Sequence, residues 1–283
     1  MNEMLEVRGL AKRYGEPALR DVSFALPPGY IMGLVGPNGA GKTTTINAIL
    51  GFIHPDSGTV KLFGDGARGD LTRVGVVMDA PLFLDEWRVG QVGRVLAPSY
   101  PRWDQAAFLG HLERFGLDGA RRVKALSRGM KVKLQLALAL SQGADLLILD
   151  EPTSGLDPLV REDVCDLLLG FVGDERKSVL LSTHITQDLE RIADFITLID
   201  GGRTTYSGTK DELLERYRRV AGGPDGIGHE GVIGAREHPT GFEGLIEAGA
   251  APALPAGVIC EPATLEQIVV GLVRAGREKE AAR

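Results

Sequence analysis

The sequence predicts an α/β fold that carries a helical insertion and ends in a small α+β extension. Short apolar runs such as 30–35 and 144–149 are typical of strands buried in a parallel sheet, and stretches with helical spacing separate them. Residues 85–143 read as a helical subdomain, because apolar residues recur there at helical spacing. The composition then changes, and a stretch rich in Gly precedes short strand-like runs. We therefore predict one domain at 1–220 and a small accessory region at 221–283.

The bulk composition is that of a globular protein that folds in water. Of its 283 residues, 43% are hydrophobic and 25% charged, and the net charge of -6 gives no support to a nucleic-acid partner. The two cysteines are far apart and fit no metal spacing, which indicates a reducing, cytoplasmic setting. No apolar run approaches the ~20 residues that span a bilayer, and the first residues lack the features of a signal peptide. Any connection to a membrane is therefore expected to come through a partner.

Two alternating stretches, 5–10 and 19–26, predict the first strands. Tyr14 lies between them. Its aromatic face suits stacking on a nucleotide base, although an aromatic residue near a strand end is more often a packing residue. A turn at 27–29 then leads into the apolar strand 30–35.

The stretch 36–44 fills every position of G-x-x-x-x-G-K-[ST], the phosphate-binding loop of nucleotide hydrolases. It lies between an apolar strand and the start of a helix, so backbone N–H groups and the helix dipole create an anion site. We expect Lys42 to reach the β- and γ-phosphates and the Thr43 hydroxyl to ligate Mg²⁺. The predicted nucleotide contacts of this loop are Gly36, Pro37, Asn38, Gly39, Ala40, Gly41, Lys42, Thr43 and Thr44.

Two further strands are expected at 58–64 and 74–78, and Asp79 ends the second. The loop that follows holds three large apolar residues beside two acids, namely Phe83, Leu84 and Trp87 beside Asp85 and Glu86. Each apolar residue alone is as consistent with the core as with the surface. Three of them in an acidic loop favour a partly exposed patch that contacts another protein.

A helix is expected from Ser127 to about residue 140, with Ser127 as its N-cap. Basic residues surround its start, and a solvated basic face is the simpler interpretation. The alternative is a second anion site, formed by Ser127 and the backbone amide of Gly129 at a helix N-terminus.

Acidic and histidine side chains follow two predicted buried strands. The strand 144–149 ends in Asp150 and Glu151, and the strand 177–183 ends before His184. The carboxyl ends of parallel strands are where α/β sheets bind ligands. Asp150 suits a role in holding Mg²⁺, and Glu151 is placed to orient and polarise an attacking water. A lone histidine is usually structural, but this position favours a functional one.

After His184 the sequence pattern predicts strands and helices, but we find no chemical motif there. A hairpin is expected at 195–207 and a helix at 211–219. In the accessory region, 231–235 and 257–260 read as short strands, and Thr264 starts a final helix with a capping-box pattern.

From residue 5 to about 219, the motifs occur in the order found in the ATP-binding subunits of ABC transporters, and this part of the chain resembles that family. The resemblance implies the phosphate-loop ATPase core of the family, a mixed sheet with helices, with ATP and Mg²⁺ as ligands and ATP hydrolysis as the reaction. It assigns Tyr14 to stacking on adenine. It also makes 126–130 the signature segment, in which Ser127 and Gly129 contact phosphate.

The same resemblance assigns the catalytic groups. Glu151 corresponds to the catalytic glutamate and His184 to the switch histidine, with Lys42 as the phosphate-binding lysine. Asp157 closes the segment 154–157, which corresponds to the loop that borders the nucleotide between two subunits.

Two regions depart from the family pattern. Arg128 stands where the signature usually has Gly, and Met130 where it usually has Gln. Asp79 stands where a Gln usually touches Mg²⁺ and senses the membrane subunit. An acid can also ligate Mg²⁺, although its charge would repel a γ-phosphate at close range. The predicted metal ligands are therefore Thr43, Asp150 and Asp79.

The segments 126–131 and 151–158, with the strand-rich tail, are similar to those of type-2 exporters, most closely the ATPases of bacitracin-type and phenol-soluble-modulin-type systems. This implies export of a peptide, antibiotic or similar amphipathic substrate through a separate membrane-spanning subunit, powered from the inner face of the cell membrane. It also implies a head-to-tail pair of ATPase subunits, identical or different, with each ATP between the phosphate loop of one and Ser127 and Gly129 of the other. The alternative is a soluble scaffold or regulatory ATPase of the same family, and a neighbouring gene with about six apolar spans would decide for transport.

Overall fold

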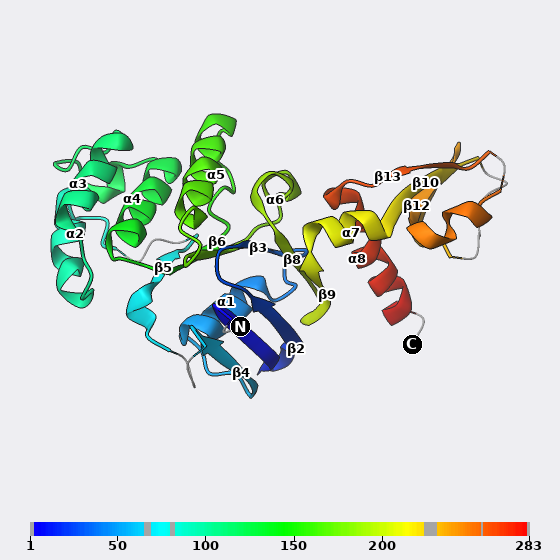
Figure 1. Cartoon of the computed structure of the whole chain (residues 1–283), viewed down its shortest axis with the longest axis horizontal. Helices are drawn as coiled ribbons and strands as arrows, with labels where there is room; N and C mark the ends of the chain where they lie inside the picture. Colours follow the sequence, from blue (N-terminus) through cyan, green and yellow to red (C-terminus); the bar gives the residue numbers. More distant parts are fainter. Residues whose placement is uncertain (1–2, 65–68, 80–82, 224–230, 256, 282–283) are drawn as a thin grey trace.

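The computed structural model describes residues 3–64, 69–79, 83–223, 231–255 and 257–281. Figure 1 shows an elongated molecule with a group of helices at one end, a large sheet in the middle and a smaller sheet at the other end. The helices are α1 (Lys42–Leu50), α2 (Val89–Leu96), α3 (Gln105–Arg114), α4 (Arg128–Ser141), α5 (Pro158–Val172), α6 (Thr186–Ile192), α7 (Lys210–Arg216) and α8 (Leu265–Ala281). Within the described ranges, no helix is long and apolar enough to cross a membrane.

The large sheet has nine strands in the order β4-β1-β2-β9-β8-β3-β7-β6-β5. They are β1 (Leu5–Tyr14), β2 (Glu16–Leu26), β3 (Ile31–Val35), β4 (Ser57–Leu62), β5 (Val74–Val77), β6 (Leu146–Asp150), β7 (Ser178–Ser182), β8 (Phe195–Asp200) and β9 (Arg203–Thr209). Strands β8, β3, β7, β6 and β5 run parallel, whereas β1 pairs antiparallel with β2 and β4. The predicted α/β class is therefore confirmed, with a mixed sheet.

Alternate residues of the parallel strands enter two cores, one on each face of the sheet. Leu147 and Leu149 of β6 pack with α5 and α6. Leu146 and Ile148 pack on the opposite face with α1 and the antiparallel strands. Because successive side chains of a strand point to opposite faces, an unbroken apolar run is required where both faces are covered.

Helices α2, α3 and α4 form the predicted helical insertion beside β5 (Figure 1). Phe108 is fully buried in its core, where other helices of the insertion meet. Turns divide the segment into separate helices, although the pattern reads as helical throughout. In the acidic loop before α2, Phe83 and Trp87 are half-buried against this core, whereas Leu84 is 62% exposed. Of the predicted apolar patch, Leu84 is thus the residue that solvent reaches most.

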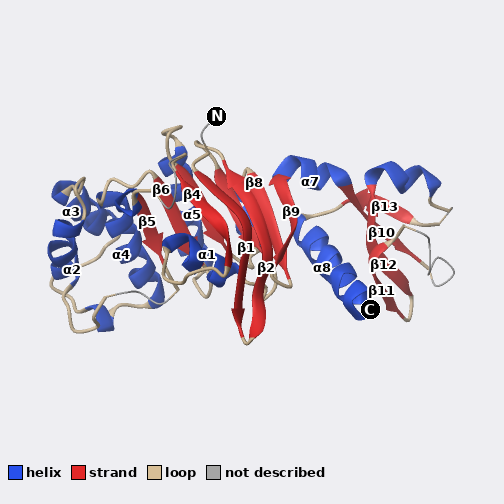
Figure 2. Ribbon diagram, turned by 90° about the horizontal axis from the view of Figure 1, so that it is seen from below, coloured by secondary structure: helices blue, strands red, loops and turns tan. Residues whose placement is uncertain are grey.

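The smaller sheet has the order β11-β12-β10-β13, and its strands are β10 (Tyr217–Gly222), β11 (Ile233–His238), β12 (Gly241–Glu247) and β13 (Ile259–Pro262). Figure 2 shows α8 between the two sheets, where it packs on α6 and β8 on one side and on β11 on the other. Leu265 and Ile268 of α8 are fully buried in the core that also contains Leu198 of β8. The predicted domain boundary at residue 220 falls within β10, and where the accessory region begins stays a prediction.

The structure differs from the sequence prediction after residue 216. The helix expected at 211–219 ends at Arg216, and β10 follows, paired with β12 on one side and β13 on the other. These pairs satisfy the backbone and bury Tyr217 and Val220, which outweighs the local preference for helix. Strand β12 is absent from the prediction because its glycines weaken the strand pattern.

Candidate functional site

The phosphate-binding loop 36–41 joins β3 to α1. Gly41, just before the helix, has a φ of 109°, a left-handed conformation that favours glycine. A Cβ there would lie 2.6 Å from Cδ2 of Leu19 and 2.9 Å from the carbonyl oxygen of Ala18. Strand β2 thus packs directly on the loop and holds it against the start of α1.

The Lys42 ammonium lies at the centre of the site. Its side chain is only 7% exposed. Nζ donates to the carbonyl of Gly36 at 2.8 Å and lies 3.7 Å from Oε1 of Glu151. A buried ammonium requires acceptors and a counter-ion, which the loop backbone and this carboxylate provide. The positive charge adds to that of the helix N-terminus and strengthens the attraction for phosphate.

Thr43 and Asp150 provide oxygen atoms that fit a magnesium ion. Thr43 Oγ1 donates to Asp150 Oδ2 at 2.8 Å, and Oδ1 of Asp150 is buried without a hydrogen-bond partner among the described residues. A buried carboxylate oxygen is costly unless a donor or cation meets it. Mg²⁺ takes oxygen ligands and usually binds through one or two protein groups together with phosphates.

Glu151 and His184 meet at the carboxyl ends of β6 and β7. Glu151 has a φ of 51°, which is uncommon for a residue with a side chain, and its N–H donates to the carbonyl of Ser182 at 2.9 Å. Its Oε2 lies 2.7 Å from Nδ1 of His184. Strained backbone of this kind is found mainly at functional sites. The structure therefore brings five predicted residues together at one edge of the sheet, namely Lys42, Thr43, Asp150, Glu151 and His184.

Three other predicted contacts lie at helix starts. Ser127 caps α4 by accepting from the N–H of Met130 at 3.3 Å, and Gly129 lies in the first turn of that helix. Asp157 caps α5 by accepting from the N–H of Val160 at 3.1 Å. Helices α4 and α1 pack on opposite faces of the large sheet. The nucleotide contacts predicted for these residues stay predictions.

Tyr14 and Asp79 contact charged side chains of the same chain. Tyr14 lies exposed at the tip of the β1–β2 hairpin, with the Lys12 ammonium 5.6 Å from its ring centroid. Asp79 follows β5, and its carboxylate pairs with the guanidinium of Arg128. Their predicted roles, in stacking on adenine and in binding metal, stay predictions.

Gln135 and helix α8 also lie near the predicted site residues, although no sequence motif predicted this. The buried amide of Gln135 in α4 accepts from the N–H of Met78 and donates to the carbonyl of Met78, both at 3.0 Å. These two hydrogen bonds hold Met78, the residue before Asp79, in place. A glutamine on an otherwise apolar helix face was the one feature of the sequence that could have indicated this role. Helix α8 lines a hollow of about 340 Å³ together with Gly36 and His184.

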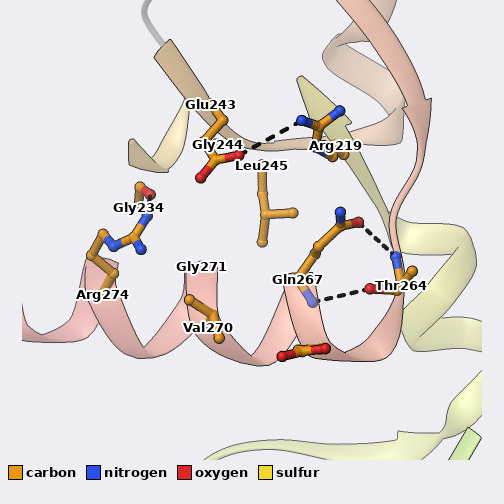
Figure 3. A pocket seen from close by; sticks show the side chains of 11 residues that line it. Arg219, Gly234, Glu243, Gly244, Leu245, Thr264, Gln267, Val270, Gly271 and Arg274 are labelled. Atoms are coloured by element: carbon orange, nitrogen blue, oxygen red, sulfur yellow. Dashed lines mark hydrogen bonds and ion pairs between the residues drawn. The ribbon is translucent and has the colours of Figure 1, made fainter. Parts of the chain in front are cut away.

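A larger hollow of about 450 Å³ lies between α8 and the smaller sheet (Figure 3). Arg219, Leu245 and Arg274 are among the residues that line it. Arg274 donates to the carbonyl of Gly234 at 3.0 Å, and Arg219 lies 3.6 Å from the carboxylate of Glu243. Its arginines are thus engaged within the chain, and no predicted nucleotide contact lines it.

Comparison with known proteins links this geometry to one family. The family model described as ABC transporter matches residues 19–154. The Nod factor export ATP-binding protein I of Ralstonia nicotianae is 37% identical over 221 residues, which cover 75% of this chain and 68% of that protein. The daunorubicin/doxorubicin resistance ATP-binding protein DrrA of Streptomyces peucetius is also 37% identical, over 74% of this chain and 66% of that protein. A solved ATP binding subunit of an ABC transporter superposes with a TM-score of 0.67 at 29% identity, covering 74% of this chain and 91% of that one.

These matches confirm the predicted family, and the two relatives, one named for export and one for drug resistance, agree with an exporter group. The family match contains the phosphate loop as well as Asp150 and Glu151, which lie at the sheet edge described above. The chain belongs to the ABC transporter family, in which it is an ATP-binding subunit that hydrolyses ATP to drive transport.

Proposed function

We propose that this chain powers the export of a peptide, an antibiotic or a similar amphipathic substrate through a separate membrane-spanning subunit. Support comes from the relatives, one named for export of Nod factor and one for resistance to daunorubicin and doxorubicin. In this proposal the chain works in the cytoplasm, and the membrane-spanning subunit holds it at the inner face of the membrane.

The loop 36–44 and Lys42 bind the β- and γ-phosphates of ATP in this proposal. The Lys42 ammonium donates to the neutral carbonyl of Gly36, and a negatively charged phosphate oxygen is a stronger acceptor, so the ammonium is placed to transfer to phosphate. Thr43 and Asp150 hold Mg²⁺ through their oxygen atoms. When bound, the ion neutralises part of the phosphate charge.

The proposed mechanism of hydrolysis rests on the position of the Glu151 carboxylate. One of its oxygens lies 3.7 Å from Nζ of Lys42, and the other lies 2.7 Å from Nδ1 of His184. A carboxylate held beside a phosphate loop is placed to orient a water and to accept its proton as that water attacks the γ-phosphate. His184 fixes the direction of this carboxylate.

We also propose that two such subunits, identical or different, pair head to tail. Ser127 and Gly129 open α4 on the face of the sheet opposite α1. That position suits the ATP of a facing subunit better than the ATP of the same chain. In this pair Tyr14 stacks on adenine, and Asp157 borders the nucleotide between the subunits.

Co-expression of the full chain with the membrane-spanning proteins encoded beside its gene tests the proposal. We expect a complex that contains two ATPase subunits and that, in lipid vesicles, moves substrate only with ATP and Mg²⁺. The matched control is the same complex with Glu151→Gln, which should assemble without transport. A chain that hydrolyses ATP but associates with none of these proteins would favour a soluble scaffold or regulatory ATPase instead.

A further inference from the structure

Asp79 and Arg128 form an ion pair that links the large sheet to the helical insertion. Nη2 of Arg128 lies 2.5 Å from Oδ1 of Asp79, across 49 positions of sequence. Asp79 lies just beyond β5, and Arg128 is the first residue of α4. Both positions stand out in the sequence, and the structure brings the two side chains into contact.

Folding stability does not account for this pair. The Arg128 side chain is 49% exposed and the Asp79 side chain 58% exposed. Ion pairs that are this exposed add little to stability, because water and salt screen them. The two groups can therefore separate easily when another anion competes for the guanidinium.

Arg128 is the first residue of α4, at the positive end of this helix. Ser127 caps this helix, and no acidic residue occurs in its first turn. The Asp79 carboxylate pairs with the side chain of this first residue, near a helix end that favours negative charge. On its other side, Arg128 borders the turn that follows Glu151, since a Cβ on Gly155 would lie 3.7 Å from Nε of Arg128.

We propose that Arg128 binds the terminal phosphate of ATP held by the facing subunit, and that Asp79 is its counter-ion until the two subunits close. This inference rests on the head-to-tail pairing proposed above. The planar guanidinium binds phosphate through two parallel charge-assisted hydrogen bonds. A triphosphate carries more negative charge than one carboxylate and displaces it. Asp79 therefore opposes closure through Arg128 and does not act as a ligand of Mg²⁺.

Substitutions of Arg128 and of Asp79 should shift the ATP concentration needed for dimerisation in opposite directions. The parent is the full chain with Glu151→Gln, and light scattering measures the ATP concentration that gives half of the maximal dimer. Arg128→Ala should raise this concentration about tenfold or more, because charge-assisted hydrogen bonds to phosphate are lost. Asp79→Asn should lower it, because Arg128 no longer has a competing carboxylate. A pair that only braced the fold would instead shift both variants in the same direction.

Glu86→Gln is the matched control, because it breaks the exposed ion pairs that Glu86 makes with Arg122 and Lys124 in the helical insertion. It should leave the half-maximal ATP concentration unchanged. Arg128→Lys keeps the charge without the two-pronged geometry and should recover only part of the loss. An unchanged concentration with Arg128→Ala, or a rise with Asp79→Asn, overturns the inference and leaves the head-to-tail pairing intact. If the parent and every variant stay monomeric with ATP, the pairing and the inference both fail.

Discussion

Nδ1 of His184 lies 2.7 Å from Oε2 of Glu151, although the two residues are 33 positions apart. The register of the sheet brings them together, because β6 and β7 run parallel with Asp150 opposite Ser182. Glu151 follows the first of these strands and His184 lies just beyond the second, so both lie at the same edge. The imidazole thus restrains the carboxylate that also faces Lys42.

Glu151→Gln should stop hydrolysis and leave ATP binding intact. The amide keeps the shape of the carboxylate but cannot accept a proton from water, and general-base assistance is typically worth ~10²–10⁴-fold in rate. We expect kcat to fall by that factor and an ATP-bound dimer to accumulate. Steady-state hydrolysis and equilibrium ATP binding measure the two effects, with Glu113→Gln on the exposed side of α3 as the control. Near-normal hydrolysis would show that another group activates the water.

Ser127→Arg should abolish ATP-driven dimerisation without weakening ATP binding to a single subunit. The long side chain occupies the space that would receive phosphate from the facing subunit, whereas Lys42 and its loop are unchanged. Loss of a helix cap costs about 0.5–2 kcal/mol, so thermal melting is measured on the same samples. Ser127→Thr keeps a capping hydroxyl and is the matched control. An equal loss of ATP affinity in the monomer would count against the head-to-tail arrangement.

Much of the site could be predicted because its residues carry local signals. Lys42 and Thr43 belong to a motif that lies within one short segment, and Asp150 and Glu151 end an unbroken apolar strand. The fold class followed from the same runs, because a strand that is apolar on both faces must have helices over both.

Features that depend on packing between distant segments could not be predicted. The sequence singled out Asp79, as a predicted metal ligand, and Arg128 separately, and nothing in the local pattern indicated that they pair, because the loop after β5 meets the start of α4 only in the folded chain. Strand β10 begins at Tyr217, where the local pattern favours helix. The strand forms by pairing with β12 and β13, which lie far along the chain, so the local sequence could not indicate it. Helix α8 reaches the hollow beside Gly36 through its packing on α6 and β8, which no local sequence pattern indicates.

Leu84 should contact the membrane-spanning subunit. It is 62% exposed in an acidic loop, whereas Trp87 is half-buried against the helical insertion. Leu84→Ala should weaken association without lowering Tm, because the residue buries little surface within the chain. Trp87→Ala should lower Tm, because it removes a large packed side chain. Pull-down and melting are measured on both variants, and a Leu84→Ala protein with normal association and a clearly lower Tm would contradict the assignment.

The two cysteines should differ in reactivity. Burial raises the pKa of the Cys165 thiol in α5 to about 11. Because the thiolate is the reactive form, Cys165 should resist alkylation near pH 8 while the chain is folded. Cys260 on β13 is exposed and should react readily. Mass spectrometry after iodoacetamide treatment should find Cys260 labelled in the folded protein and both cysteines labelled after denaturation. Rapid labelling of Cys165 in the folded state would show that α5 opens from the sheet.

Ile268→Ala should destabilise the two sheets together. Ile268 of α8 is fully buried in the core that also holds Leu198 of β8 and Leu245 of β12. Its truncation leaves a cavity between the sheets, and substitutions of this kind cost about 2–5 kcal/mol. Because the core is shared, calorimetry should show one cooperative transition at a lower Tm. Val270→Ala on the exposed side of α8 is the control and should change Tm little. If Ile268→Ala shifted only a separate, smaller transition, α8 and the smaller sheet would fold as an independent unit, and the boundary predicted at residue 220 would gain support.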